Sequence, residues 1–405
     1  MKFDFIHAQC LKFAANRERA LREGLEIRRL NIAVDRQDYV VNWTQREDKR
    51  NVVLHAVGSA DNESGYVFGM HPNFDPALDR DEVEEEARGA GDYEVPEPFR
   101  RHARVWLQGD YDKSLVEFLK RQAQRSGSRA PLDQAIAATY AKAVSRSDVE
   151  VAEVKNPTVQ PPRKGMQIHS EYTLYAHFRL LRDLFSGVGK VNFYLDQDSG
   201  MRAACLSIFE QEIKDGKADA FYVRLAKEVT VPEKQAALTR SRAEIYRWQE
   251  RFPDLTPREV EFLMIREQMR NMRAYGKWND CWLTHPFPNM SEPEKAVCYL
   301  TDRGETHEDH LAWMYYKASL HSIDRFFMQV RRRLSLLERA IGTASTARRM
   351  WYGYSAYNPE MIVKLLDIFR VYYNYCLAGQ DERTPAMRLG LSKAVSTVED
   401  ILYLV

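Results

Sequence analysis

Three aspartates, Asp35, Asp196 and Asp324, lie far apart in the sequence, and each has a different local pattern around it. Asp35 lies in the run LNIAVDRQDYVVNW, Asp196 ends the run KVNFYLD, and Asp324 lies near the start of an Arg-rich amphipathic run. Carboxylates presented by two strands and one helix can hold two divalent metal ions about 3.5–4 Å apart, and such a site performs in-line phosphoryl transfer on nucleic acid. We therefore expect all three residues to be catalytic and to be metal ligands.

The run around Asp35 is rich in β-branched and apolar residues, which predicts a strand. Successive side chains on a strand point to opposite faces, so Asp35 and Asp38 cannot both face one metal site. We favour Asp35 because it follows Ile32, Ala33 and Val34 and would lie in mid-sheet, where an unpaired acid is costly. The alternative is a partly exposed Asp35 that pairs with Arg36.

Asp196 directly follows a buried strand, and ligands gather at the carboxyl ends of strands in α/β sheets. Ser199 is a good N-cap for the helix that follows, and Asp198 could cap that helix instead. The alternative for Asp196 is also a role in the turn or the cap.

The run SLHSIDRFFMQVRRRLSLLER predicts a helix with a continuous apolar stripe, and Asp324 borders that stripe. Arginines close to a metal-binding acid would neutralise phosphates. The alternative is a solvated helix face, with Asp324 in a surface ion pair. The candidates for DNA contacts are Arg325, Arg331, Arg332, Arg333, Arg348 and Arg349.

The order of elements predicts an α/β fold, a mixed sheet flanked by helices and interrupted by large, mostly α-helical insertions. The segments are an N-terminal helix (1–24), a first part of the core (25–70), an insertion and linker (71–165), a second part of the core (166–227), an α-helical insertion (228–317), and the catalytic helix with a C-terminal helical region (318–405). Aromatic residues in 228–317 could stack on unpaired bases or, more commonly, fill a helical core.

Composition excludes several classes of protein. Lys plus Arg number 59 and Asp plus Glu 58, so no global charge points to a partner. The five cysteines form no metal-ligand spacing, which fits a reducing cytoplasm and argues against a disulfide framework or a structural zinc site. His307 and His310 could share a metal, but no third ligand is evident. No membrane span, secretory signal, phosphate-binding loop or GxSxG motif is present.

In these segments the chain resembles bacterial insertion-sequence transposases with a DDE-type, ribonuclease H-like catalytic core. The resemblance rests on AVDRQDYVVNW with VVLHAVGSADNESGYVFG, on FYLDQDSG, on HSIDRFFMQVRRRLSLLERAIGTASTARRMWYG and on RTPAMRLGLS. It implies two Mg²⁺ (or Mn²⁺) ions bound by Asp35, Asp196 and Asp324. It also implies double-stranded DNA as partner (element ends and target), a homo-oligomer on that DNA, no membrane, and a bacterial cytoplasmic location at the nucleoid.

Three features depart from the family's pattern. The third acid is Asp324 where Glu is commoner, so the chain would be a DDD variant whose shorter acid must approach the metals more closely. The long separations between the three acids demand two insertions. The chain also begins almost directly at the expected core, without the usual N-terminal DNA-recognition domain. The alternatives are a catalytically inactive, transposase-derived DNA-binding protein and a helical scaffold with coincidental acids.

Overall fold

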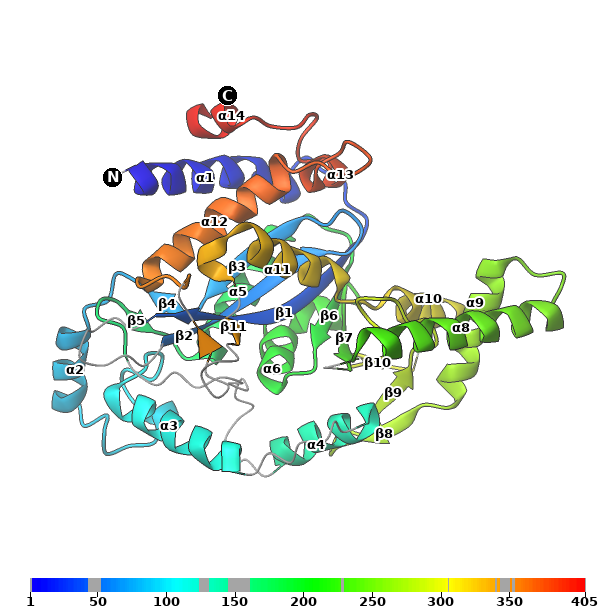
Figure 1. Cartoon of the computed structure of the whole chain (residues 1–405), viewed down its shortest axis with the longest axis horizontal. Helices are drawn as coiled ribbons and strands as arrows, with labels where there is room; N and C mark the ends of the chain where they lie inside the picture. The colour runs from blue at the N-terminus through cyan, green and yellow to red at the C-terminus, as the bar shows by residue number, and fades with distance from the viewer. Residues whose placement is uncertain are drawn as a thin grey trace.

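A mixed eight-stranded sheet forms the centre of the protein, in the order β3-β2-β1-β6-β7-β10-β9-β8 (Figure 1). The computed structural model describes residues 2–42, 52–123, 131–144, 161–226, 229–304, 306–338, 341–342, 350–351 and 354–404. The protein is thus an α/β protein with helices on both faces of its sheet.

In the first part of the sheet, β3-β2-β1-β6-β7, only β2 runs against the other strands. Strand β2 (Val52–Asp61) is antiparallel to both β1 (Leu30–Val41) and β3 (Val67–Pro72). Strands β1, β6 (Val191–Asp196) and β7 (Ala218–Leu225) run parallel to one another. Strand β1 therefore lies in the interior of the sheet, between an antiparallel and a parallel neighbour.

Alternation along β1 and β6 divides the apolar core into two parts. Ile32, Val34 and Leu195 belong to the core that also holds residues of α5 (Ser170–Leu184) and α6 (Ser199–Ile208). Ala33 and Tyr194 belong to the other core, with residues of α10 (Glu308–Lys317), α11 (His321–Arg333) and α12 (Pro359–Tyr375). We call these two sides of the sheet the α5 face and the α11 face.

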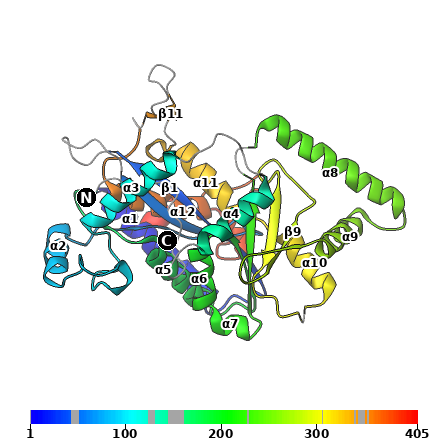
Figure 2. The same ribbon diagram turned by 90° about the horizontal axis from the view of Figure 1, so that it is seen from below.

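The remaining elements surround this sandwich. They are α1 (Lys2–Glu18), β4 (Phe74–Asp75) paired with β5 (Met166–Gln167), α2 (Arg80–Gly89), η2 (Glu97–Phe99), α3 (Gln108–Ala123), α4 (Leu132–Val144), α7 (Glu210–Lys214), α8 (Val231–Arg251), α9 (Pro257–Arg270), β11 (Ile341–Gly342) paired with β12 (Met350–Trp351), α13 (Pro385–Leu389) and α14 (Val398–Tyr403). Helices α8 and α9 lie at the end of the molecule opposite α2 in both views (Figures 1 and 2).

The prediction that residues 228–317 are α-helical is wrong in part. Strands β8 (Arg273–Tyr275), β9 (Asp280–Thr284) and β10 (Lys295–Tyr299) continue the sheet beyond β7, all in antiparallel pairing. The strands have only three to five residues each, and the central residues of β10 are buried on both of its faces. Such short apolar runs resemble pieces of a buried helix, so periodicity alone does not separate the two structures.

The third predicted site element, the Arg-rich helix, is shorter than its apolar stripe indicated. Helix α11 ends at Arg333, and Leu334 has an extended backbone with φ of −112°. A single turn of 3-10 helix, Ser335–Leu337, follows and keeps Leu337 in the core.

Candidate functional site

Asp35 lies on the α11 face of the sheet. It pairs with Gly58 of β2 in the antiparallel register, and directly opposed residues of antiparallel strands point to the same face. A Cβ atom at Gly58 would lie 2.8 Å from Ile323 Cδ1 and 3.0 Å from Phe327 Cε1, both on α11. Helix α11 thus packs directly over the strand position next to Asp35.

Asp196 occupies the adjacent place on the neighbouring strand. The last paired residues of β1 and β6 are Val34 and Leu195, and one residue further along these parallel strands come Asp35 and Asp196. Val34 and Leu195 both point to the α5 face. Because successive side chains on a strand point to opposite faces, Asp35 and Asp196 point to the α11 face. Asp196 is only 7% exposed. Two carboxylates, one of them buried, are therefore side by side on one face of the sheet.

Asp324 reaches this face from α11. The start of the helix is fixed over β2 because Ser322 Oγ donates to the Ala60 carbonyl at 3.3 Å and to Asn62 Oδ1 at 2.7 Å. Asp324 is half-buried and directly follows Ile323, which contacts the Gly58 position. Asp35 and Asp196 thus lie at adjacent strand positions, and Asp324 belongs to the helix that packs on the same face.

The two edges of α11 face different surroundings. Arg325, Gln329 and Arg333 line a polar cavity of about 270 Å³, whose lining also includes Tyr373 of α12 and Arg388 of α13. Residues 324, 328 and 331 project from the other edge of the helix, because they lie roughly 60–180° around the axis from that row at 100° per residue.

The predicted arginines are therefore not a single group. Arg331 shares its helix edge with Asp324, and its charge acts on Tyr39 of β1, a residue of the α11 face. Burial nevertheless raises the pKa of Tyr39 above its ordinary value. Arg325 and Arg333 belong to the cavity on the other side of the helix, and Arg332 is exposed. Arg348 and Arg349 lie outside the described residues.

Arg36 is a buried cation close to several acids. It forms an ion pair with Asp198 at 2.6 Å, with side chains 7% and 4% exposed. Burial opposes its charge, but the carboxylates of Asp198, Asp38, Asp196 and Asp35 together hold the pKa of Arg36 above its ordinary value. Asp38 and Asp198 lie with Arg36 on the α5 side of β1, whereas Asp35 and Asp196 lie on the α11 face.

Asp38 and Asp198 have structural partners on the α5 side of the sheet. Asp38 lies opposite His55 in the register, and its Oδ1 is 2.7 Å from His55 Nδ1. Asp198 caps α6 by accepting a hydrogen bond from the Met201 amide at 2.9 Å. The predicted N-cap role of Ser199 is thus wrong, and the alternative in which Asp198 caps the helix is confirmed.

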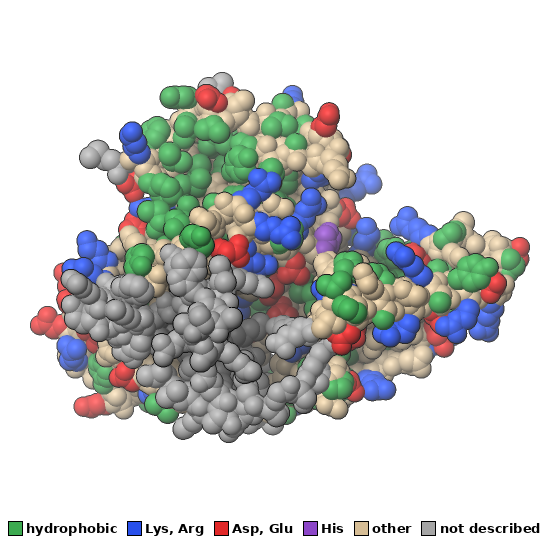
Figure 3. Space-filling view, in the orientation of Figure 1, with side chains coloured by type: hydrophobic (Ala, Val, Ile, Leu, Met, Phe, Trp, Pro, Cys, Tyr) green, Lys and Arg blue, Asp and Glu red, His purple; other side chains and the backbone are tan. Residues whose placement is uncertain are grey.

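In the space-filling view, acidic side chains lie in a recess beneath α11, with Lys and Arg side chains above them (Figure 3). The recess lies between the body of the molecule and the part formed by α8, α9 and α10 (Figures 1 and 3).

The aromatic residues of the 228–317 segment divide between the two interpretations. Trp282 and Tyr315 are buried in the cores, whereas Tyr246 and Trp278 are 62% and 44% exposed. Trp248 lines a cleft of about 1060 Å³ between α4, α8, α9 and β8–β10. The basic residues of this cleft are balanced by acidic ones, so charge alone assigns it no ligand.

The histidines His307 and His310 do not form the metal pair considered from their spacing. His307 is exposed and lies 3.6 Å from Asp309, and the His310 ring stacks on Trp313. A different group, Glu97, His169 and Glu171, brings three potential ligand atoms within 4.8 Å of one another. Sequence reasoning missed it, and the only local signal is a His two residues before a Glu at a helix start.

Comparison with known proteins gives no relative. The chain matches no protein-family model, and no curated protein or solved structure is significantly similar to it. In the described part of the chain, no helix has the length and apolar character needed to cross a membrane.

Proposed function

We propose that this chain is a DNA transposase whose Asp35, Asp196 and Asp324 hold two Mg²⁺ (or Mn²⁺) ions. The observation that carries the proposal is the placement of Asp35 and Asp196 at adjacent positions of parallel strands, on the face that α11 covers. The strand order β3-β2-β1-β6-β7, with only β2 antiparallel, also supports it, because ribonuclease H-like sheets have that arrangement.

The donor set fits the proposed ions. Magnesium prefers oxygen ligands and usually binds through one or a few carboxylates together with substrate phosphates. Asp35 and Asp196 place two carboxylates at adjacent strand positions, and two neighbouring carboxylates favour a bound cation. Asp35, Asp196 and Asp324 would hold the ions, whose chemistry would be to activate a water or a DNA 3′-hydroxyl as nucleophile and to stabilise the leaving 3′-oxygen, so that one site could cut and rejoin strands.

The arginines of α11 have two tasks in this proposal. Arg331, on the edge that carries Asp324, would neutralise the phosphate at the reacting bond. Arg325 and Arg333, with Arg388, would hold a phosphate of the same DNA on the far side of the helix. Double-stranded DNA is the proposed partner, and a homo-oligomer would assemble on it.

The direct test is nicking of supercoiled plasmid in Mg²⁺ or Mn²⁺. We expect metal-dependent nicking by the natural protein and a loss of at least about 100-fold in Asp35→Asn and Asp196→Asn, because each change removes a charge that holds the ions. The matched control is Asp215→Asn, an exposed aspartate in the turn after α7, which should nick normally. Equal nicking by Asp196→Asn and the control would exclude this site.

A second outcome separates the enzyme from the inactive DNA-binding alternative. DNA binding that weakens steeply with salt, without nicking in either metal by any variant, would overturn the catalytic proposal and leave a binding protein with the same fold. Calorimetric titration of Mn²⁺ into the natural protein and Asp196→Asn, with generic duplex present, adds a readout that needs no cognate DNA.

A further inference from the structure

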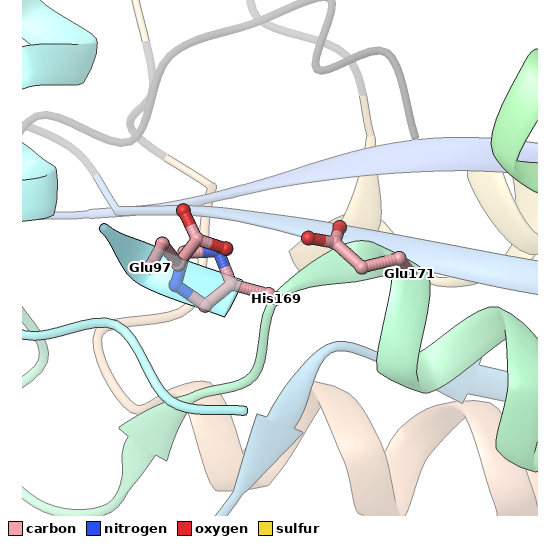
Figure 4. A group of neighbouring side chains, drawn as sticks. All are labelled: Glu97, His169 and Glu171. Carbon is pink, nitrogen blue, oxygen red and sulfur yellow. The ribbon is translucent and has the colours of Figure 1, made fainter. Parts of the chain in front are cut away.

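A second set of potential metal ligands lies where the segment after α2 crosses the start of α5. Glu97 belongs to η2, His169 precedes α5, and Glu171 lies in the first turn of that helix. Figure 4 shows the Glu97 carboxylate beside the His169 ring and the Glu171 carboxylate directed toward both. One ligand atom of each residue lies within 4.8 Å of the other two.

The His169 ring is held in one orientation. It is 6% exposed and stacks on Trp106, with ring centroids 5.1 Å apart and planes inclined by 19°. Its Nδ1 lies 3.2 Å from Glu97 Oε1, and its Nε2 lies 3.6 Å from Asp110 Oδ2. The ring therefore presents Nδ1 to the Glu97–Glu171 side and Nε2 to Asp110.

The Asp110 carboxylate is itself held in place by hydrogen bonds. Arg100 Nη1 donates to both of its carboxylate oxygens, at 3.0 and 2.8 Å, and the Leu107 amide donates to Oδ2 at 3.0 Å. Histidines that bind metals usually direct their other ring nitrogen to a carboxylate, which fixes the tautomer and raises the basicity of the ligand. Asp110 stands where that partner is required, which is an observation independent of the three ligands themselves.

The chemistry of the set indicates the ion. One imidazole and two carboxylates suit a borderline divalent metal such as Zn²⁺, which such ligands bind at about 2.0–2.2 Å. Donors at that distance from one ion lie within about 4 Å of each other. Glu171 is half-buried and can close the remaining gap by rotating its side chain.

We propose that Glu97, His169 and Glu171 bind one divalent transition-metal ion, with Zn²⁺ as the representative, and that Asp110 orients the histidine. The ion would join η2, which belongs to the segment between β4 and α3, to the start of α5 in the core. The competing occupant is a proton, which would make His169 a cation between Glu97 and Asp110. A proton and a metal ion cannot both occupy Nδ1 of His169. A measurement of bound metal therefore distinguishes a metal site from a protonated histidine.

The test uses the full-length chain with Asp196→Asn as background, so that it does not depend on the proposed catalytic site. Protein stripped with EDTA is reloaded with Zn²⁺ near pH 8, and bound zinc is measured by mass spectrometry after desalting. We expect one Zn²⁺ per chain in the background, and its loss in both Glu97→Gln and Glu171→Gln. The control Glu85→Gln, on the exposed side of α2, should keep the ion.

Thermal unfolding supplies the second readout. Zn²⁺ should raise the unfolding midpoint of the background and of Glu85→Gln, because an ion that binds only the folded state stabilises it. Neither Glu97→Gln nor Glu171→Gln should respond to zinc, and their midpoints without zinc show that they fold. Equal zinc content in all four proteins, or no retained zinc in the background, would overturn the proposal and leave His169 as a protonated partner of the two acids.

Discussion

Asp35 faces Gly58 across the β1–β2 pair, and the missing side chain at Gly58 is what lets α11 lie against the sheet at that level. Helix α11 contacts the Gly58 position through Ile323 and Phe327, which lie one turn apart on either side of Asp324. Gly58 takes no part in the proposed chemistry, but it sets how far Asp324 on the helix lies from Asp35 on the sheet.

We expect Gly58→Ala to lower the free energy of unfolding by about 1–3 kcal/mol, because the added methyl overpacks a closed contact with Ile323 and Phe327. It should reduce metal-dependent nicking further than stability alone explains, since it moves Asp324 from the sheet. Urea unfolding and plasmid nicking measure the two effects. Gly89→Ala is the control, since a Cβ there meets nothing within 4 Å; equal effects of the two substitutions would contradict the argument.

The identity of the third acid gives another prediction. If Asp324 approaches the ions because α11 lies close to the sheet, a longer acid will not fit. We expect Asp324→Glu to reduce nicking about 10- to 100-fold while the free energy of unfolding changes little, because the residue is half-buried at the helix edge. Activity equal to that of the natural protein would mean that the site tolerates either acid.

The face and level of Asp35 could be predicted from the period of two along β1, and the strand end at Asp196 from the apolar run before it. Their adjacency could not, because the register of parallel strands β1 and β6 depends on a crossover of many residues. The division of the α11 arginines could not be predicted either. A helix pattern shows which residues share an edge, but only the packing of α12 and α13 decides that Arg325 and Arg333 line a cavity.

The Glu97–His169–Glu171 group illustrates a different limit. Its members come from two segments whose contact depends on the fold of the insertion between β4 and α5. No spacing rule links Glu97 to His169 along the chain. Strands β8–β10 were missed for a related reason, since three to five residues carry too short a pattern to identify a strand.

The buried ion pair Arg36–Asp198 should dominate stability near the site. Removing one partner leaves an uncompensated buried charge, so we expect Arg36→Met to lower the free energy of unfolding by about 3–5 kcal/mol. Adding Asp198→Asn should recover part of that loss, because asparagine still caps α6. The control Arg179→Met removes an exposed pair with Asp183 and should cost less than about 1 kcal/mol. Additive losses in the double variant would show that the pair is not coupled.

Two histidines, the half-buried His71 of β3 and the buried His177 of α5, should make stability fall in mild acid. Their Nδ1 atoms lie 2.8 Å apart, so one neutral ring donates to the other. Burial lowers the pKa of His71 from 6.5 to about 4, and burial together with the neighbouring His71 lowers the pKa of His177 well below its ordinary value. The unfolded chain therefore binds more protons than the folded chain between pH 6.5 and 4.

It follows that the free energy of unfolding has its full value above pH 6.5 and decreases as the pH falls toward 4, by about 3 kcal/mol from His71 alone. Urea unfolding at pH 7.5 and pH 5 measures the slope. His71→Gln should reduce the slope, and the double variant His71→Gln, His177→Gln should flatten it, because glutamine takes up no proton in either state. The exposed His307→Gln should leave the slope as it is. A full slope in the double variant would assign the acid sensitivity to other groups.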